Sequence, residues 1–466
     1  MSSAENICDK LKRESTDIQN YEKAKEFACQ YVLNVDARNV APTNAAIENL
    51  SHFKENLPPG GADTPEILRL LHEYGSPATI AQTGGRYFGF VNGGAIPASV
   101  AAKWLSDVWD QNAALNVLSP IASALEEICE NWIVDLFGFP KETAAGLVSG
   151  SSTATLCGII AARNYLLKRK GYDVAKNGLF GAPSIRVIVS EEAHSTVFKA
   201  LSISGLGTER IEKIKSDSEG RIDYSRVPPL DDNTLLILQA GNVNTGAFDN
   251  FNILCKEANA KGAWVHVDGA FGLWAKASEK FDILTDSIEL ADSWSTDAHK
   301  TLNVPYDCGI ILCRNRKALT DALRMEGAYI ISGEKRDGMY YTLDMSRRAR
   351  SIELWAALKS LGRNGVKELV DNLHDKAMYF AGKLIENGFQ ILNDVCFNQI
   401  NVFIGDDSAT KTFLSNLQNS GVCWCGGSKR FEKSFVRISV CSYKTTNDDI
   451  DKSVEAFIRA RKNNNG

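Results

Sequence analysis

The sequence predicts an α/β protein with a mostly parallel sheet, followed by a smaller α+β domain at the carboxyl end. From about residue 143, short apolar and β-branched runs alternate with segments of helical spacing, the pattern of a buried parallel sheet. After Arg347 a long helical segment leads into a region where strands and helices are mixed. Sites in such sheets form at the carboxyl ends of the strands, so we expect chemistry there.

Individual elements follow from the same patterns. Buried strands are expected where a short apolar run is bounded by turn residues, over 184–190, 234–238, 263–267 and 309–313. Helical spacing predicts helices over 153–170, 195–206, 251–261, 349–361 and 366–387. The last part adds strands over 389–392, 399–404 and 435–440. We therefore predict an amino-terminal arm (1–83), a large domain (84–360) and a small carboxyl-terminal domain (361–466).

Composition narrows the class of partner. The 466 residues are 44% hydrophobic and 23% charged, ordinary values for a globular protein. A net charge of −5 provides no basic field for nucleic acid or anionic lipid, so a small-molecule partner is expected. The charged amino terminus and the absence of a run of roughly 18 apolar residues argue against secretion and membrane insertion. The 11 scattered cysteines form no disulfide framework, which favours a cytoplasmic location.

Two stretches in the first third of the chain are open to more than one interpretation. Residues 84–94 are rich in glycine and aromatic residues, which suits either close approach to a ligand or a loop packed on the core. The polar cluster Trp109-Asp110-Gln111-Asn112 is either a helix cap with a turn or part of a substrate pocket.

Two polar stretches follow the early strands. Residues 149–155 (Ser-Gly-Ser-Ser-Thr-Ala-Thr) open a helix, where free N–H groups and hydroxyls suit a phosphate, although serine and threonine at a helix start are commonly simple caps. His194, in Glu-Ala-His-Ser, comes after a strand, where its ring could lie on an aromatic cofactor. A lone histidine is more often structural.

Two further stretches carry a carboxylate and a lysine. Asp268 ends an apolar strand in His-Val-Asp-Gly-Ala, and an unpaired carboxylate there would cost several kcal/mol, so it needs a partner such as a protonated ring nitrogen. Lys300, in Asp-Ala-His-Lys, is expected in a short polar turn over 292–300, where a fixed amine can form a Schiff base with an aldehyde.

A phosphate loop, a stacking histidine, a carboxylate and a Schiff-base lysine, in this order, are typical of a pyridoxal 5′-phosphate site. With these motifs, the chain from about Gly84 onward resembles the group II pyridoxal-phosphate-dependent amino acid decarboxylases, which include aromatic amino acid and glutamate decarboxylases. The resemblance implies an aspartate aminotransferase-like (fold type I) structure and loss of the carboxylate of an L-amino acid as carbon dioxide, with no metal ion expected.

The resemblance also implies roles for individual residues. Lys300 would hold the cofactor covalently, and Asp268 would keep its ring nitrogen protonated. The remaining contacts implied are stacking by His194, packing of Ala270 under the ring, phosphate binding by Ser151, Ser152 and His299, and a nearby position for Asn244. Tyr87, Phe88, Phe90 and Trp109 would line the entrance, which favours an aromatic or apolar substrate. A homodimer is expected, with the arm wrapping the partner.

Three positions depart from the family pattern. The position of the loop tyrosine linked to protonation in relatives falls on Gly338. The candidate loop is 327–346, which holds Tyr329, Tyr340 and Tyr341. Either Tyr340 or Tyr341 substitutes from a shifted place, or the protonation step differs and the outcome is not simple decarboxylation. Asp297 stands where aromatic amino acid decarboxylases have asparagine near the phosphate, and repulsion predicts that it points elsewhere. Thr301 replaces a common tryptophan.

Other interpretations of the function share the same cofactor features. An aminotransferase or a carbon–carbon lyase would need the same four stretches, and Arg437 could bind a substrate carboxylate in an aminotransferase as well as in a decarboxylase. A third interpretation is not an enzyme but a catalytically silent binding protein that kept the fold. The intact Lys300, Asp268 and His194 argue against it.

Overall fold

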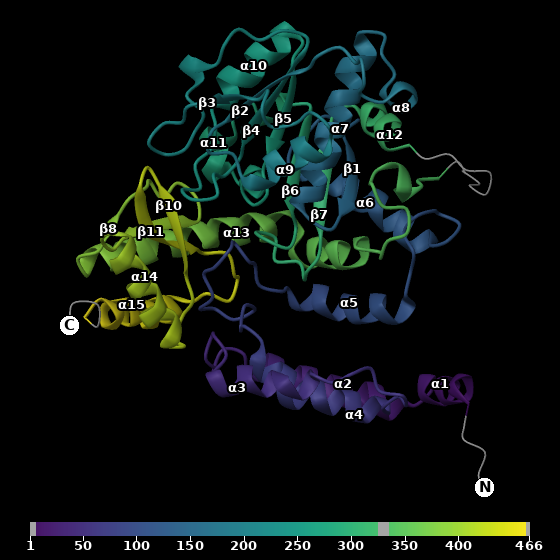
Figure 1. Cartoon of the computed structure of the whole chain (residues 1–466), viewed down its shortest axis with the longest axis vertical. Helices are drawn as coiled ribbons and strands as arrows, with labels where there is room; N and C mark the ends of the chain where they lie inside the picture. The colour runs from purple at the N-terminus through teal and green to yellow at the C-terminus, as the bar shows by residue number, and fades with distance from the viewer. Residues whose placement is uncertain (1–5, 325–334, 463–466) are drawn as a thin grey trace.

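The computed structural model describes residues 6–324 and 335–462, and its centre is a seven-stranded sheet in the order β1-β7-β6-β5-β4-β2-β3 (Figure 1). Its strands are β1 (Ala144–Val148), β2 (Arg186–Ser190), β3 (Glu212–Ile214), β4 (Thr234–Gln239), β5 (Trp264–Asp268), β6 (Ser293–Asp297) and β7 (Gly309–Cys313). Pairing is parallel from β3 through β6, and β7 runs antiparallel to both β6 and β1. The predicted α/β class with a mostly parallel sheet is confirmed.

A second, four-stranded sheet follows in the carboxyl-terminal part, in the order β10-β11-β9-β8. Its strands are β8 (Gln390–Ile391), β9 (Gln399–Phe403), β10 (Gly426–Arg430) and β11 (Lys433–Ser439), all paired antiparallel. The α+β region expected there is present.

Helices cover the sheets and build the arm. They are α1 (Ile7–Ser15), α2 (Ile18–Asn34), α3 (Asn44–Glu48), α4 (Thr64–Leu70), α5 (Pro97–Trp109), α6 (Pro120–Leu136), α7 (Ser151–Arg169), α8 (Val174–Asn177), α9 (Ser195–Ile203), α10 (Phe251–Lys261), α11 (Asp282–Thr285), α12 (Arg316–Leu323), α13 (Ser351–Glu386), α14 (Asp407–Asn419) and α15 (Asn447–Lys462). The two helices expected around residue 361 meet in α13 at a kink, where Gly362 has a φ of 61°. Within the described ranges no helix is both long and apolar enough to span a bilayer.

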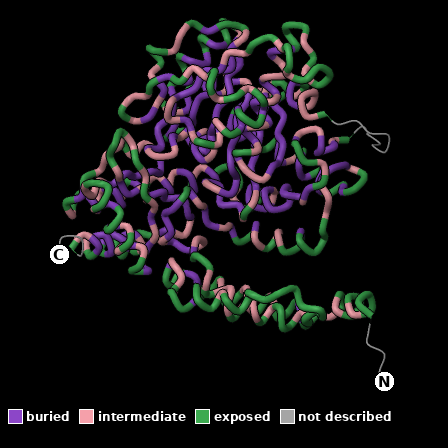
Figure 2. The backbone as a smooth tube through the Cα atoms, viewed as in Figure 1, coloured by how far each residue is buried: buried purple, intermediate pink, exposed green. Residues whose placement is uncertain are grey.

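The amino-terminal helices lie apart from the rest of the chain. Helices α1 to α4 form a separate layer that extends away below α5 (Figure 1). Figure 2 shows this layer mostly exposed or intermediate, whereas the sheet region is largely buried. The arm is tied to the body near residues 36–40, where the Arg86 guanidinium donates to the Asp36 carbonyl and the Val40 N–H donates to the Gly421 carbonyl.

Residues 292–300 differ from the expected polar turn, because Ser293–Asp297 forms the buried strand β6. Its hydroxyls are satisfied by neighbouring elements. The Ser293 Oγ accepts from the Trp264 indole at 3.0 Å, and the Ser295 Oγ pairs with the Thr155 hydroxyl at 2.8 Å. A polar strand of this kind is stable only inside a sheet that supplies such partners.

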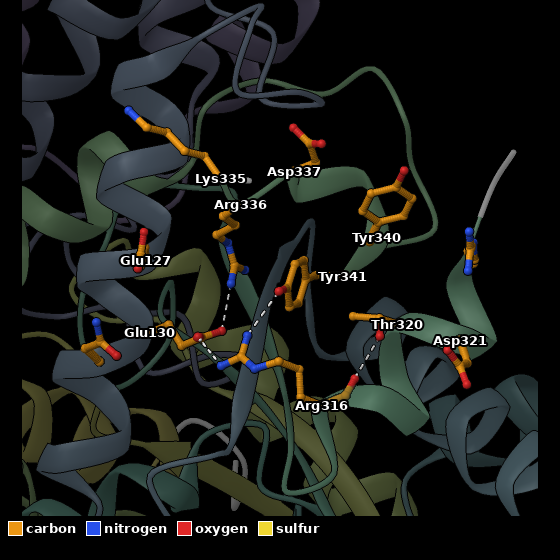
Figure 3. Close-up of a pocket in the computed structure, with 12 residues that line it drawn as sticks. Glu127, Glu130, Arg316, Thr320, Asp321, Lys335, Arg336, Asp337, Tyr340 and Tyr341 are labelled. Carbon is orange, nitrogen blue, oxygen red and sulfur yellow. Dashed lines mark hydrogen bonds and ion pairs between the residues drawn. The ribbon is translucent and has the colours of Figure 1, made fainter. Parts of the chain in front are cut away.

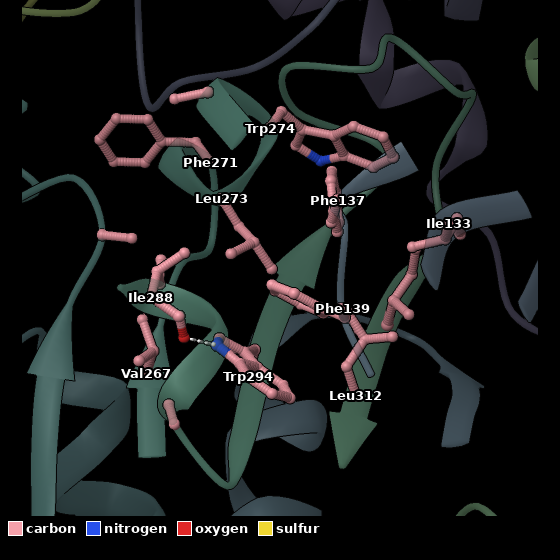
Figure 4. Close-up of a cluster of buried hydrophobic side chains, with 14 of the residues drawn as sticks. Ile133, Phe137, Phe139, Val267, Phe271, Leu273, Trp274, Ile288, Trp294 and Leu312 are labelled. Atoms are coloured by element: carbon pink, nitrogen blue, oxygen red, sulfur yellow. Dashed lines mark hydrogen bonds between the residues drawn. The ribbon is translucent and has the colours of Figure 1, made fainter. Parts of the chain in front are cut away.

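The core beneath β6 fixes the strand that leads to Lys300. The Trp294 ring stacks on Phe139 with centroids 4.1 Å apart, and its indole N–H donates to the Ile288 carbonyl at 3.0 Å (Figure 4). On the same side, the Trp274 indole donates to the Asp297 carbonyl at 3.0 Å. These contacts set the position of the chain just before the lysine.

Candidate active site

Three neighbouring strands bring the residues of 149–155 and 292–300 together at one edge of the sheet. In β7, Gly309 is in register with Val148 of β1 on one side and Asp297 of β6 on the other. A Cβ on Gly309 would lie 2.5 Å from the carbonyl carbon of Gly150, so only glycine lets the loop after β1 cross here. Ser151, the first residue of α7, is thereby placed beside the end of β6.

The turn that carries Lys300 is held by Asn303, a residue that the sequence reasoning missed. Asn303 is fully buried with a φ of 59°. Its side-chain amide donates to the carbonyls of Lys300 and Thr301, while its oxygen accepts from the N–H groups of Gly94 and Tyr443. A buried asparagine in a turn before Val-Pro was the available signal, since asparagine tolerates the left-handed conformation.

Thr301 has a packing role in this turn. It is fully buried, and its hydroxyl donates to the Phe271 carbonyl at 2.7 Å. The bond ties the lysine turn to the segment after Asp268.

Asp297 points into the site, so the expectation that it points elsewhere is wrong. Its carboxylate accepts from the Ser151 N–H at 2.5 Å and from the Ser151 hydroxyl at 2.7 Å. A further partner of this carboxylate is the Lys300 Nζ, 3.0 Å from the Asp297 Oδ2. The prediction considered only repulsion by phosphate. In the folded chain the carboxylate has the first N–H of a helix and an ammonium as partners, and both attract it.

His299 lies on the same side, beside Tyr306. Its Nδ1 accepts from the Cys308 N–H at 3.1 Å, which leaves the proton on Nε2, 3.7 Å from the Asp297 Oδ1. Burial lowers the pKa of this imidazole, against the opposing effect of Asp297. A neutral ring with an Nε2–H donor directed at the Asp297 carboxylate results.

Asp268 ends β5, next to β6, and is buried. Its carboxylate accepts from the Ala270 N–H at 3.2 Å. Burial raises its pKa, and the nearby His194 and Lys300 oppose that shift. A buried carboxylate beside an imidazole and an amine is stabilised further by a protonated heterocycle. The residues present therefore fit the ring of pyridoxal 5′-phosphate.

His194 caps helix α9 and is oriented by the next turn. Its Nδ1 lies 2.7 Å from the Thr196 hydroxyl and accepts from the Thr196 N–H at 3.3 Å. Burial lowers the pKa of His194, with Asp268 opposing. The ring is thus neutral, and Nε2 carries its free N–H.

The remaining residues expected near the cofactor are placed as follows. Ser152 is exposed, one residue into α7, and Ala270 bridges the site through its backbone, donating to Asp268 and accepting from the Asp297 N–H at 2.9 Å. The Asn244 side chain accepts from the Ser428 hydroxyl of β10 at 2.7 Å, so it links the two sheets.

A cavity of about 620 Å³ opens beside His194, with Asn244 and Arg437 in its lining. Arg437 donates to the Val243 carbonyl at 3.1 Å, and burial lowers its pKa. Other charged groups of the lining are paired, as in the Arg430–Glu192 ion pair at 2.5 Å. Arg437, which is partly buried, is therefore a cation available to a carboxylate in this cavity.

The glycine-rich stretch 84–94 lies directly against the lysine turn. A Cβ on Gly93 would overlap the Lys300 carbonyl oxygen, so the close approach expected of these glycines is realised against the protein's own backbone. Tyr87 and Phe90 stack on Trp424, with ring centroids 5.2 and 5.4 Å apart. Phe88 does not line an entrance, because it is fully buried in the core of the smaller sheet, edge-on to Phe380.

The cluster 109–112 is a cap and a turn. Asp110 ends α5 in the left-handed conformation, and the Asn112 side chain accepts from the Ala114 N–H at 3.1 Å. Trp109 is about half exposed at the end of α5.

Tyr340 and Tyr341 line a different cavity, of about 730 Å³, whose lining does not include His194; Lys300 and Asp268 are among the lining residues of neither cavity. The Tyr341 hydroxyl accepts from Arg316 at 3.0 Å, and its ring packs under the Arg336 guanidinium. Figure 3 shows the Tyr340 hydroxyl pointing away from this cluster. Tyr329 lies outside the described residues.

Gly338 has no room for a side chain. A Cβ there would overlap the Arg347 guanidinium and lie 2.6 Å from the Ala113 carbonyl and 2.9 Å from the Glu126 carboxylate. A tyrosine at 338 is incompatible with the buried Glu126–Arg347 ion pair, whose N–O distance is 2.6 Å. The packing around this ion pair thus accounts for the departure at this position.

Comparison with known proteins shows the family of this chain. A family model described as "Pyridoxal-dependent decarboxylase conserved domain" matches residues 78–402. An aromatic-L-amino-acid decarboxylase of Bacillus atrophaeus is 29% identical over 71% of this chain and 70% of its own length. An aspartate 1-decarboxylase of Aliivibrio fischeri is 31% identical over 50% of this chain and 45% of its own length.

Solved structures share the fold. The Oryza sativa TDC structure with PLP and tryptamine superposes with a TM-score of 0.87 at 20% identity, covering 99% of both chains. The aspartate aminotransferase-like architecture expected from the resemblance is therefore present.

Proposed function

Because the chain belongs to the pyridoxal-dependent decarboxylases, whose family model covers residues 78–402, we propose that it converts an aromatic or apolar L-amino acid to its amine and carbon dioxide. Pyridoxal 5′-phosphate dependence and decarboxylation of an amino acid follow from the family and its relatives. The observation that carries the assignment to this site is the placement of Asp268 at the end of β5, of Lys300 in the turn after the neighbouring β6, and of His194 at the start of α9.

The residue roles follow from their placement. The Lys300 amine would bind the cofactor's aldehyde, and Asp268 would hold the ring nitrogen protonated. His194, Ala270 and Asn244 would surround the ring, while Ser151, Ser152 and His299 would hold its phosphate. When bound, the cofactor supplies a conjugated ring that accepts the electron pair left by the departing carboxylate.

Substrate binding is assigned to the cavity beside His194. The partly buried Arg437 would attract a carboxylate, and the neutral His194 Nε2–H would donate a hydrogen bond to it, so that the bond to be broken is held in one orientation. The aromatic-rich stretch 84–94, whose Tyr87 and Phe90 stack on Trp424, lies against the Lys300 turn and supports an aromatic or apolar side chain. The name of the Bacillus relative supports the same class.

Protonation of the product carbon is assigned to Tyr340 or Tyr341. Tyr340 is the better candidate. Its hydroxyl points away from the ion-pair cluster, whereas the Tyr341 hydroxyl is bound there by Arg316. Because neither tyrosine lines the cavity beside His194, the donor would act on the site of a second copy of the chain.

A homodimer is supported by exposed apolar side chains that a monomer would leave in water. They lie on α5 and the following loop and on the arm, and include Trp104, Leu105, Val108, Leu118, Ile18 and Leu33. Sedimentation should give twice the monomer mass, and Val108→Asp should lower the mass toward one chain. A monomeric wild type would refute this assembly. The cytoplasmic location is checked by cell fractionation, where recovery in a membrane pellet would contradict it.

An aminotransferase or lyase remains the alternative for the same cofactor residues. The purified, cofactor-loaded protein should release carbon dioxide and a matching amine from an aromatic amino acid without any keto acid. Lys300→Ala should abolish this release, whereas Lys176→Ala, which removes an exposed ion pair with Asp173, should not. Release from aspartate alone would overturn the substrate class, and product formed only with a keto acid would favour an aminotransferase.

A further inference from the structure

Asp297 occupies the hydrogen-bond donors that an anion at the start of α7 would use. Its two oxygens accept from the Ser151 N–H at 2.5 Å and from the Ser151 hydroxyl at 2.7 Å, and the side chain is 2% exposed. A carboxylate is itself an anion, so it already satisfies the positive end of this helix.

The backbone holds Asp297 in this position. Its N–H donates to the Ala270 carbonyl at 2.9 Å, and its carbonyl accepts from the Trp274 indole at 3.0 Å. It is also the last residue of β6, in register with Gly309. A side chain on so fixed a backbone can rotate, but it cannot leave the vicinity of Ser151.

A third partner gives the carboxylate a second effect. The Lys300 Nζ lies 3.0 Å from Oδ2, so Asp297 also fixes the position of the amine that would react with the cofactor's aldehyde. This second effect does not depend on whether the ligand carries a phosphate.

We propose that Asp297 sets the cofactor affinity of this protein by competing with the cofactor's phosphate for Ser151. The phosphate then contributes less to binding than the same donors would allow if residue 297 were neutral. The inference rests on the proposed phosphate site at Ser151, and it makes Asp297 a positioning residue for Ser151 and Lys300.

The test compares two ligands that differ only in phosphate. Dissociation constants for pyridoxal 5′-phosphate and for pyridoxal are measured by equilibrium dialysis with wild type and Asp297→Asn. Their ratio isolates the phosphate, since the effect on Lys300 is common to both ligands. The ratio of the pyridoxal constant to the pyridoxal 5′-phosphate constant should rise at least tenfold in Asp297→Asn, about 1.4 kcal/mol.

Asp292→Asn is the matched control. Asp292 directly precedes β6 at its opposite end, is partly buried, and accepts from the Val265 N–H at 2.8 Å. Its variant should leave the ratio unchanged. Asp297→Ser carries the same expectation as Asp297→Asn and serves if the asparagine variant does not fold.

The outcomes separate this inference from the assignment of function. A ratio that stays constant or falls in both Asp297 variants, with wild type binding pyridoxal 5′-phosphate, would overturn the inference alone, since Asp297 would then organise the donors for the phosphate. Wild type that binds neither ligand would overturn the cofactor site together with it.

Discussion

Replacing Gly309 by alanine tests whether the spacing of β7 builds the cofactor site. A Cβ at this position would meet the Gly150 Cα, and lie 2.5 Å from its carbonyl carbon and 2.7 Å from its nitrogen. Ordinary carbon contacts begin near 3.4 Å, so the loop before α7 must move by about 1 Å. A shift of this size would break the Ser151 geometry, where hydrogen bonds weaken steeply with distance and angle.

The expected magnitudes follow from this overlap. Overpacking a core position costs roughly 1–3 kcal/mol, which should appear as a lower midpoint in urea unfolding. Cofactor affinity should fall by about tenfold, the equivalent of roughly 1.4 kcal/mol, because Ser151 opens the helix that is proposed to bind the phosphate. Equilibrium dialysis with pyridoxal 5′-phosphate measures the second effect.

Gly382 supplies the control. It lies inside helix α13, and a Cβ there would meet nothing within 4 Å. Gly382→Ala should stabilise the protein by roughly 0.5–1 kcal/mol, since alanine is the better helix former, and leave cofactor binding unchanged. If Gly309→Ala bound the cofactor as tightly as wild type, the loop after β1 would not depend on β7 and the reasoning would fail.

Two more predictions concern the buried His266 and the tyrosines at 340 and 341. Burial lowers the pKa of His266 from 6.5 to about 3. The folded state then binds fewer protons than the unfolded chain below pH 6.5, so the free energy of unfolding decreases as the pH is lowered. Between pH 7.5 and 5.5 wild type should lose about 1.4 kcal/mol more than His266→Gln, and equal losses in urea titrations would contradict this. Tyr341→Phe should cost about 1 kcal/mol, because Arg316 loses its acceptor, whereas Tyr340→Phe should leave stability unchanged and lower amine yield. Unchanged yield in both variants would exclude both tyrosines as the proton donor.

The local pattern of apolar residues in the sequence was sufficient to predict many of the helices and strands. The helix over 251–261 has the predicted bounds, and the strands at 234–239, 264–268 and 309–313 lie where short apolar runs indicated them. The apolar residues of such a segment report its burial directly. The four stretches that predicted the cofactor were recognisable for a related reason, since each combines residue types that one cofactor requires.

Strands β1 and β6 could not be predicted in the same way. Ala144–Val148 contains two alanines and a glycine, which are poor strand formers, and Ser293–Asp297 is mainly polar, so the strand signal of each is weak. Both are stable because β7 lies between them and pairs with each. For β6, Trp264 and Thr155 also satisfy its hydroxyls.

The sequence by itself determined the α/β class and the cofactor, and it proposed Lys300, Asp268 and His194 for the cofactor site, because these depend on residue types and their order along the chain. Only the tertiary structure decided the direction of Asp297 and the exclusion of a side chain at Gly338. Both depend on which groups from distant segments approach within hydrogen-bonding or van der Waals distance, here Ser151 in the first case and the Glu126–Arg347 pair in the second. Such distances are set by the packing of the whole sheet and its helices, and no local pattern contains them.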